Sequence, residues 1–252
     1  MNSEKDFFSF KNTVQNLTES DNKQLSDYLG VIDAFARTTY KSIYVIDYEK
    51  QSFEYVSDNP LFLCGKTPEE VKALGYQFYF ENVVEEDLRL LLKINQVGFD
   101  LYDQVPLEER KLYTIAYDFR LKNKENTSIL INQKLTPIFI TEEGKVWKAL
   151  CIVSLAENNT SGNIKVYKSN SNQIKSYCLI DNCWKDEQKP TLSQREKEIL
   201  QLSAQGFKVQ EISEKLFISP DTVKFHRRKL FDKIQVSSIS EAIFYATTNK
   251  LI

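Results

Sequence analysis

The spacing of hydrophobic and polar residues changes several times along the chain, and each change marks a predicted element. Between residues 42 and 155 the two kinds of residue mostly alternate with the two-residue period of a β-strand. Five segments follow this pattern and are predicted strands: 43–47, 52–56, 112–121, 128–140 and 145–155. Between the second and third, apolar residues take helical spacing, most clearly from Glu86 onward. This order predicts an α+β domain over residues 40–157.

Two shorter segments flank this domain. Residues 1–39 are predicted to be helical, because apolar residues recur at helical spacing after the capping candidates Ser20, Asp21 and Asn22. Residues 158–190 are predicted to contain a short hairpin and then a polar linker. The two hairpin strands and the linker are 163–167, 174–180 and 184–190. Because an isolated hairpin is only marginally stable in water, we expect it to pack on the sheet or on the C-terminal part.

The last part of the chain, residues 191–252, divides into four predicted helices and forms an all-α domain. Thr191 or Ser193 caps the first helix, and Gly206 ends it. Ser219 caps the third helix, which follows the second after a tight turn and is strongly basic. This is the helix-turn-helix arrangement, which places its second helix in the major groove of DNA.

Positions around the third helix separate its residues by role. Val223, Leu230 and Ile234 share one face, which is predicted to pack in the domain core. On the opposite side, the candidate base-reading residues are Lys224, Phe225 and Arg228. Beside them, the candidate phosphate contacts are Arg227, Lys229 and Lys233.

The charge is unevenly divided between the two parts of the chain. The whole chain carries 33 Lys+Arg and 35 Asp+Glu, a net charge of −2, which excludes a uniformly basic nucleic-acid binder. Residues 191–252 nevertheless hold ten Lys/Arg and seven Asp/Glu, a net of +3, which leaves −5 for residues 1–190. A basic part behind an acidic body predicts different partners for the two.

Composition also argues against most enzyme chemistry. The one histidine, His226, lies in the basic helix, so no multi-histidine metal site can form and a catalytic role is disfavoured. The four cysteines lack a C-x-x-C pair and are expected to be reduced structural thiols: Cys64, Cys151, Cys178 and Cys183. No secretory signal is evident, and no apolar stretch approaches the roughly 18–20 residues of a membrane span. We therefore expect a cytoplasmic protein that has no metal site and is not an enzyme.

Residues 40–157 resemble a PAS domain, in the order of their elements and in four segments. The matching segments are Asn59-Pro60-Leu61-Phe62, the turn from Gly65 to Val71, Asn82 to Asp87, and Tyr117 to Leu121. Val84 and Glu85 stand where the family usually has His-Pro, so that motif is degenerate. The resemblance implies a sensory domain with a ligand pocket or, alternatively, a ligand-free dimerisation module.

The residues narrow the choice of ligand. A His-ligated haem is disfavoured because His226 lies in the basic helix, and Cys64 is not in the sequence context of a photoactive flavin adduct. The aromatic run over residues 76–80 either lines a pocket or packs in the core. We expect no required cofactor, and an unidentified small ligand remains open.

Residues 191–252 are similar to the LuxR-type helix-turn-helix. The matching residues include Leu192-Ser193, Arg195-Glu196, Ile199-Leu200, Gly206, Glu211-Ile212, Leu216, Ile218-Ser219-Pro220, Thr222-Val223-Lys224, His226 and Lys233-Ile234. The resemblance implies that Glu196 braces the core and that Thr222 and the helix N-terminus at Ser219 meet phosphate. It also implies a dimer contact on the fourth helix, for which the candidates are Ile239, Ala242, Ile243 and Tyr245.

The match departs from the LuxR pattern on the second helix. Val209 and Gln210 stand where Asn-Lys is common, and Ser213 stands where Ala is common. The first departure puts a phosphate contact in doubt, and Lys208 is the candidate that replaces it.

Together the two resemblances predict a transcriptional regulator in which a PAS-like domain controls a DNA-binding domain. The expected partners are double-stranded DNA and a second copy of the chain, with RNA polymerase as a further candidate and no membrane. Two alternatives stay open: a protein similar to sigma-factor region 4, and a signalling adaptor whose PAS-like domain binds protein. The sequence identifies neither the ligand nor the operator, and does not separate an activator from a repressor.

Overall fold

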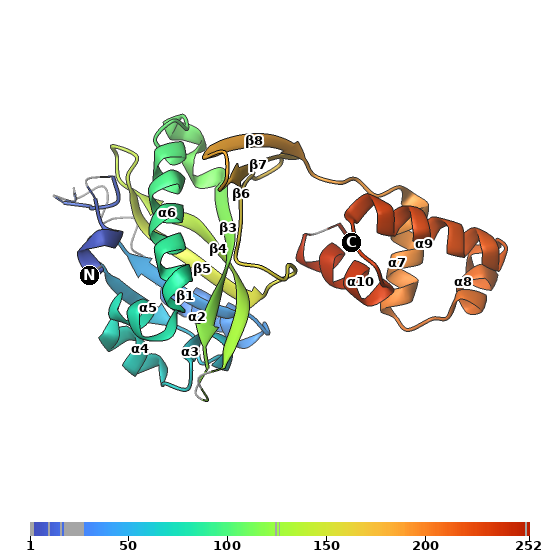
Figure 1. Ribbon diagram of the computed structural model, residues 1–252, viewed down its shortest axis with the longest axis horizontal. Coiled ribbons are helices and arrows are strands. Elements are labelled where there is room, and N and C mark those ends of the chain that lie inside the picture. Colours follow the sequence, from blue (N-terminus) through green and yellow to red (C-terminus); the bar gives the residue numbers. More distant parts are fainter. Residues whose placement is uncertain are drawn as a thin grey trace. The chain divides into compact units, whose positions relative to one another are not determined.

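The computed structural model describes residues 3–9, 11–15, 17, 28–123, 125, 127–249 and 251–252. It separates into two compact units, Met1–Glu187 and Gln188–Ile252 (Figure 1). In the described part of the chain, no helix is both long and apolar enough to span a membrane.

The first unit is built on one eight-stranded sheet with the order β2-β1-β5-β4-β3-β6-β7-β8. The strands are β1 Ser42–Asp47, β2 Ser52–Val56, β3 Tyr113–Lys122, β4 Ser128–Ile140, β5 Val146–Leu155, β6 Gly162–Lys168, β7 Gln173–Cys178 and β8 Cys183–Gln188. The five strands predicted for the PAS-like domain are all present and pair antiparallel. The unit is therefore α+β, with a PAS-like antiparallel sheet.

The segment 158–190 continues this sheet. β6 pairs antiparallel with β3, and β7 and β8 follow at the edge. The predicted polar linker is wrong over residues 184–188, which belong to strand β8, Cys183–Gln188. Of the residues of this edge strand only Trp184 is partly buried, and its ring lies 5.1 Å from that of Tyr177. The other residues of β8 are exposed and mostly polar, so the strand has the composition of a linker.

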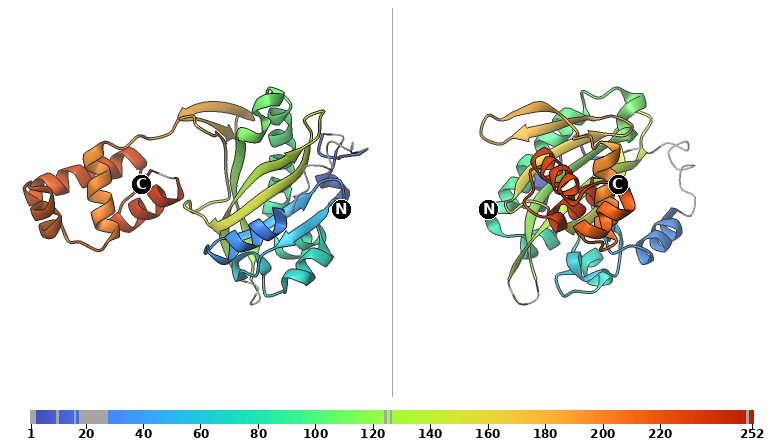
Figure 2. Two further views of the ribbon diagram at one scale, coloured as in Figure 1. Left: turned by 180° about the vertical axis from the view of Figure 1, so that it is seen from behind. Right: turned by 90° about the vertical axis from the view of Figure 1, so that its right-hand side faces the viewer.

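Five short or medium helices lie between β2 and β3. They are α3 Pro60–Leu63, α4 Pro68–Leu74, α5 Gln77–Asn82, α6 Glu85–Tyr102 and the 3₁₀ helix η2 Leu107–Leu112. α4 begins as predicted, because Thr67 and Glu70 form a capping box and Pro68 occupies the first position. α6 buries a stripe at helical spacing that includes Leu91 and Ile94, and it runs along one face of the sheet (Figures 1 and 2).

The degenerate PAS motif retains its acidic residue, which ties α6 to β3. Asp87 is buried and accepts hydrogen bonds from the Arg120 backbone at 2.7 Å and from its guanidinium at 2.8 and 2.9 Å. Burial opposes ionisation, but hydrogen bonds from Arg120 and Ser161 outweigh it and lower the pKa of Asp87. Asp87 therefore fixes the helix on the sheet without the preceding His-Pro.

The prediction that residues 1–39 are helical is wrong for the start of the chain. Residues 3–9 and 11–15 form only a 3₁₀ turn, η1 Glu4–Phe7, and irregular backbone, in which Phe7 and Val14 are buried in the core. Tertiary packing decides the conformation here. Helix α2, Tyr28–Arg37, is present, whereas the predicted caps Ser20, Asp21 and Asn22 lie outside the described residues.

The second unit is an all-α bundle of four helices, as predicted. They are α7 Gln194–Ala204, α8 Val209–Leu216, α9 Pro220–Ile234 and α10 Ile239–Thr248. Ser193, and not Thr191, caps α7, and Gly206 follows its end at φ +91°. Val223, Leu230 and Ile234 of α9 are buried, which confirms the predicted core face.

A buried ion cluster lies on the face of the sheet opposite α6. Lys148 is 3% exposed, and its ammonium is 3.0 Å from Asp47 and 2.6 Å from Glu54. The Tyr28 hydroxyl donates to the same Glu54 carboxylate, and the ring of Tyr28 packs edge-on against Phe139 at 4.9 Å. The cluster thereby attaches α2 to the sheet (Figure 2).

We expect Lys148→Ala to destabilise the first unit by about 3–5 kcal/mol, because it leaves two carboxylates without their buried counter-charge. Both tryptophans, Trp147 and Trp184, belong to this unit, so urea unfolding followed by tryptophan fluorescence measures its stability alone. Lys175→Ala removes a lysine from an exposed pair with Asp186 and should cost at most about 1 kcal/mol. Equal losses in the two variants would contradict a structural role for the cluster.

Candidate functional site

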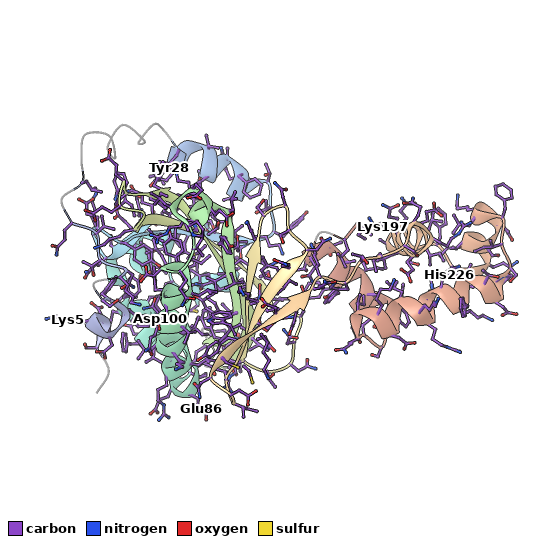
Figure 3. All side chains as sticks on the ribbon, turned by 90° about the horizontal axis from the view of Figure 1, so that it is seen from above. Lys5, Tyr28, Glu86, Asp100, Lys197 and His226 are labelled. Atoms are coloured by element: carbon purple, nitrogen blue, oxygen red, sulfur yellow. The ribbon has the colours of Figure 1, made fainter. Side chains whose placement is uncertain are left out.

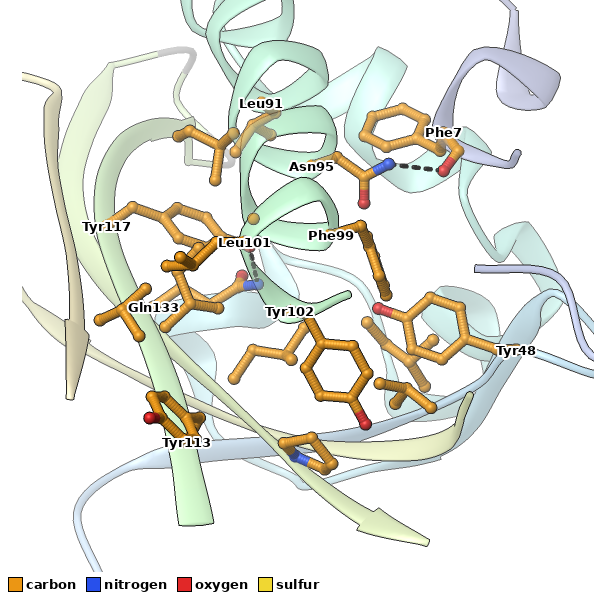
Figure 4. A pocket seen from close by; sticks show the side chains of 18 of the residues that line it. Phe7, Tyr48, Leu91, Asn95, Phe99, Leu101, Tyr102, Tyr113, Tyr117 and Gln133 are labelled. Atoms are coloured by element: carbon orange, nitrogen blue, oxygen red, sulfur yellow. Dashed lines mark hydrogen bonds between the residues drawn. The ribbon is translucent and has the colours of Figure 1, made fainter. Parts of the chain in front are cut away.

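A cavity of about 100 Å³ lies in the first unit between α6 and the sheet (Figure 4). Its wall is aliphatic and aromatic, with Phe7 and Phe99 beside six tyrosines: Tyr48, Tyr76, Tyr79, Tyr102, Tyr113 and Tyr117. The lining residues that the structure describes include no Asp, Glu, Lys, Arg or His. Of the predicted aromatic run, Tyr76 and Tyr79 line the cavity, whereas Phe78 packs in the core.

Hydrogen bonds fix the polar groups of the cavity wall. Gln133 accepts a bond from the Tyr44 hydroxyl at 2.7 Å and donates to the Tyr117 hydroxyl at 2.5 Å. The hydroxyls of Tyr44 and Tyr79 lie 2.6 Å apart. Burial raises the pKa of Tyr48, Tyr76, Tyr79 and Tyr117, so the wall is neutral at physiological pH.

The N-terminal segment closes one side of this cavity. Asn95 of α6 donates a hydrogen bond of 2.7 Å to the carbonyl of Phe7, as Figure 4 shows. The Phe7 ring packs against Tyr76 and Tyr79, at centroid distances of 5.2 and 5.6 Å. Lys11, farther along the segment, pairs with Asp100 at 2.5 Å. Residues before the PAS-like sheet thus complete the pocket, which the sequence pattern did not indicate.

In the second unit, α9 presents the three candidate base-reading residues on its exposed side. Phe225 is 55% exposed, and Lys224 and Arg228 are also exposed. The ammonium of Lys229 lies 5.4 Å from the centre of the Phe225 ring, and Lys224 forms an exposed pair with Asp221 at 3.0 Å. The structure therefore brings these side chains together on a surface that is free of core packing.

The candidate phosphate contacts fall into two groups. Lys208, Ser219 and Lys229 are exposed, and Thr222, half-buried, lies with Ser219 at the start of α9, where the Ser219 hydroxyl accepts from the Thr222 amide at 3.1 Å. Arg227 is instead half-buried and donates to Ser203 of α7 at 2.8 Å, and its burial lowers its pKa. Lys233 is engaged by Glu196. The phosphate assignments stay predictions, and Arg227 and Lys233 already have partners inside the domain.

The candidate dimer residues on α10 are mostly internal. Ala242 is fully buried in the core of its own unit and cannot reach a partner without unpacking, so its assignment as a dimer contact is wrong. Ile239, Ile243 and Tyr245 are partly buried against the same core. Phe244 is 38% exposed and is a large apolar side chain of α10 that reaches solvent.

His226 lies on α9, next to the candidate base-reading residue Phe225 (Figure 3). It is half-buried, and its ring packs edge-on against Phe225 at 5.7 Å. Across the described residues, no group of three or more His, Cys, Asp or Glu is placed to hold a metal ion.

Comparison with known proteins fits this geometry. Residues 190–246 match the family GerE, described as bacterial regulatory proteins of the luxR family. The C-terminal unit is a LuxR-type helix-turn-helix domain. Curated relatives include the oxygen regulatory protein NreC of Staphylococcus aureus, 37% identical over 103 residues, and that of Staphylococcus haemolyticus, 31% identical over the same length. Each alignment covers 41% of this chain and 48% of the relative, so the chain spans about half the length of the curated relatives it matches.

Solved structures resemble the chain weakly. A VqmA–ligand–DNA complex of Vibrio cholerae is 17% identical and covers 90% of each chain, with a TM-score of 0.35. A PAS domain from Colwellia psychrerythraea is 16% identical, with a TM-score of 0.36, and covers 52% of this chain and 98% of that one.

Glu196 holds the LuxR-type domain together, as the resemblance implied. Its buried carboxylate accepts a hydrogen bond from the Ser193 backbone at 2.7 Å and pairs with Lys233 at 2.6 Å. Burial opposes ionisation, but the bonds from Lys233 and Ser193 outweigh it, so the pKa of Glu196 is lowered. The pair joins the start of α7 to the last turn of α9, and no single helix pattern in the sequence indicates it.

We expect Glu196→Gln to destabilise the LuxR-type domain by roughly 1–2 kcal/mol at pH 7, a modest figure because Lys233 remains partly solvated. Since the folded pKa is lowered, this stabilisation is complete above about pH 4.3 and is lost as the pH falls through the folded value. Hydrogen exchange of peptides from α7 and α9 is measured at pH 7 and at a pH below the folded pKa of Glu196. The exchange rates of the variant and the wild type should converge at the lower pH. The matched control is Glu211→Gln, which alters the carboxylate that accepts a hydrogen bond from the Lys208 backbone at the start of α8 and should have a smaller effect.

Proposed function

We propose that this protein is a transcriptional regulator whose LuxR-type domain binds duplex DNA by placing α9 in the major groove. The observation that carries the proposal is the division of α9 into a buried apolar face and an exposed face with Lys224, Phe225 and Arg228. The family match of residues 190–246 supports it. As a DNA-binding regulator it would act in the cytoplasm, and it needs no catalytic group.

The exposed residues suit base recognition. Arg228 can donate two parallel hydrogen bonds to the major-groove edge of guanine, and Lys224 can donate to the same acceptors. Phe225 can contact the methyl group of thymine. The contact between Lys229 and the Phe225 ring holds both side chains along one side of the helix, which limits the rotamer entropy lost on binding.

A homodimer fits this mode of binding, because two helices one turn of DNA apart would read paired half-sites. Phe244 on α10 is the exposed apolar residue that supports such a contact. RNA polymerase is a further proposed partner for a regulator of this class.

The experiment that tests the function is enrichment of bound sequences from a random duplex pool by the purified full chain. A shared sequence in the retained fraction supports the regulator. Retention without enrichment would favour the alternative in which the basic helix is a protein-docking face, and saturable binding of RNA polymerase core enzyme would favour the sigma-like alternative.

We expect Arg228→Ala and Lys224→Ala each to lose about 1–3 kcal/mol of preference, roughly 5- to 150-fold, for the enriched duplex over a scrambled one. The physical reason is the loss of donors to base edges, which leaves phosphate binding in place. Fluorescence anisotropy with both duplexes at one salt concentration measures the ratio. Lys72→Ala removes an exposed lysine of the first unit and should leave the ratio unchanged.

An equal loss of affinity for both duplexes in the two α9 variants would contradict base reading by these residues. It would leave them only an electrostatic role, because phosphate contacts weaken binding to all sequences alike.

We further propose that the cavity in the PAS-like unit takes a small neutral ligand with an aromatic or heteroaromatic ring. An engineered apolar cavity of about 150 Å³ binds benzene, which sets the scale for a volume of about 100 Å³. The aromatic wall favours ring stacking, and the hydroxyls and the amides of Asn95 and Gln133 supply a few polar contacts. A charged ligand would lose its hydration without finding a counter-charge in the wall.

Benzamide and benzoate test whether the cavity excludes charged ligands, because they have nearly the same size and shape and differ in charge at pH 7. We expect benzamide at millimolar concentration to raise the unfolding temperature of the first unit, followed by tryptophan fluorescence, and benzoate to leave it unchanged. Stabilisation by benzoate that equals that by benzamide would contradict a neutral site.

A further inference from the structure

Two cysteines flank the turn of the last hairpin of the first unit. β7 ends at Cys178, β8 begins at Cys183, and residues 179–182 form the turn between them. The side chains of Tyr177 and Trp184 are in contact at 5.1 Å, and Lys175 pairs with Asp186 at 2.7 Å. β7 and β8 are neighbours in the sheet, and from the register in which both contacts are directly opposed we infer that Cys178 lies opposite Cys183.

This placement meets the geometric requirement of a disulfide. Directly opposed residues in antiparallel strands have Cα atoms about 4.5–5.5 Å apart, within the range of about 4.4–6.8 Å that a disulfide spans. The thiol of Cys178 is half-buried and that of Cys183 is exposed, and all four cysteines are free thiols in the structure.

Charged groups surround the two sulfurs. The Cys178 thiol donates to the Asp181 carboxylate at 3.2 Å, and Lys185 pairs with the same carboxylate at 2.6 Å. Hydrogen bonding to Asp181 raises the pKa of Lys185, and both cysteines contribute a smaller electrostatic effect in the same direction. Lys185 therefore places a cation beside the carboxylate that holds the Cys178 thiol.

The other two cysteines differ in every one of these respects. Cys64 and Cys151 are buried in the core, and burial raises the pKa of Cys64 to about 11 and that of Cys151 further. They are structural thiols, as predicted, and serve as internal controls in the same chain.

We propose that Cys178 and Cys183 are a redox-active dithiol that is converted to an intramolecular disulfide by low-molecular-weight disulfides. The exposed Cys183 thiolate attacks one sulfur of the reagent, whose S–S bond breaks, and one reagent thiolate leaves and takes up a proton. Cys178, as its thiolate, then attacks the Cys183 sulfur of the mixed disulfide, and the second reagent thiolate leaves. Two protein thiols are oxidised, and one reagent disulfide is reduced to two thiols.

The modification falls on the last strand before the LuxR-type domain in the sequence. The ring that it closes is short and lies on an exposed edge, which is typical of labile disulfides and not of purely structural ones. The proposal is independent of DNA binding and of the cavity ligand.

The test uses the reduced full chain and oxidised glutathione in excess, followed by alkylation of free thiols and tryptic mass spectrometry. Cleavage after Lys175 and Lys185 places both cysteines in one peptide, residues 176–185. We expect this peptide to lose two hydrogen atoms, to escape alkylation and to recover both thiols after treatment with dithiothreitol. Cys64 and Cys151 should remain reduced until the chain is unfolded.

Single variants test the order of the steps. Cys178→Ser should stop at one glutathione on Cys183, whereas Cys183→Ser should react more slowly because its remaining thiol is half-buried. Two glutathione adducts on the wild-type peptide, a disulfide between two chains, or thiols that stay free would each overturn the proposal.

Discussion

The carboxylate of Glu196 lies where the beginning of the LuxR-type domain meets the end of its recognition helix. It caps α7 through Ser193 and pairs with Lys233 in the last turn of α9. A 15-residue helix is marginal by itself in water, so α9 depends on such tertiary contacts. Arg227, bonded to Ser203, provides a second attachment near the middle of α9. With these attachments and its apolar face buried, α9 can present only one side to a partner, and that side carries Lys224 and Arg228.

The PAS-like unit separates its charges from its cavity. The Lys148 cluster lies on one face of the sheet and the Asp87–Arg120 bonds lie at the start of α6, whereas the cavity wall has only neutral polar groups. Because unpaired buried charge is costly, Lys148 and Asp87 each have a counter-charge beside them. The polar groups of the cavity wall are tyrosine hydroxyls and side-chain amides. They can replace a hydrogen bond within the wall by one to a ligand at a small cost in free energy.

Patterns within a single element predicted most of the fold. The strands of the PAS-like sheet, the cap at Thr67 and the core face of α9 all depend on local spacing, and the structure has them as predicted. Features that depend on contacts between distant residues were missed. Phe7 packs against an aromatic cluster some 70 residues away in the chain, and no local pattern marks it. The sequence of β8 predicts a linker because an exposed edge strand buries too few residues for apolar and polar positions to alternate. The roles of Arg227 and Ala242 likewise depend on neighbours from other helices.

Photo-crosslinking tests the central claim, that the exposed side of α9 is the surface that meets DNA. A p-benzoylphenylalanine at position 225 replaces an exposed aromatic residue of α9, and the same residue at position 244 replaces an exposed aromatic residue of α10. On the enriched duplex, we expect a crosslink to DNA from position 225 and none from position 244. A duplex that is bound but crosslinks only from position 244, or from neither position, would contradict it.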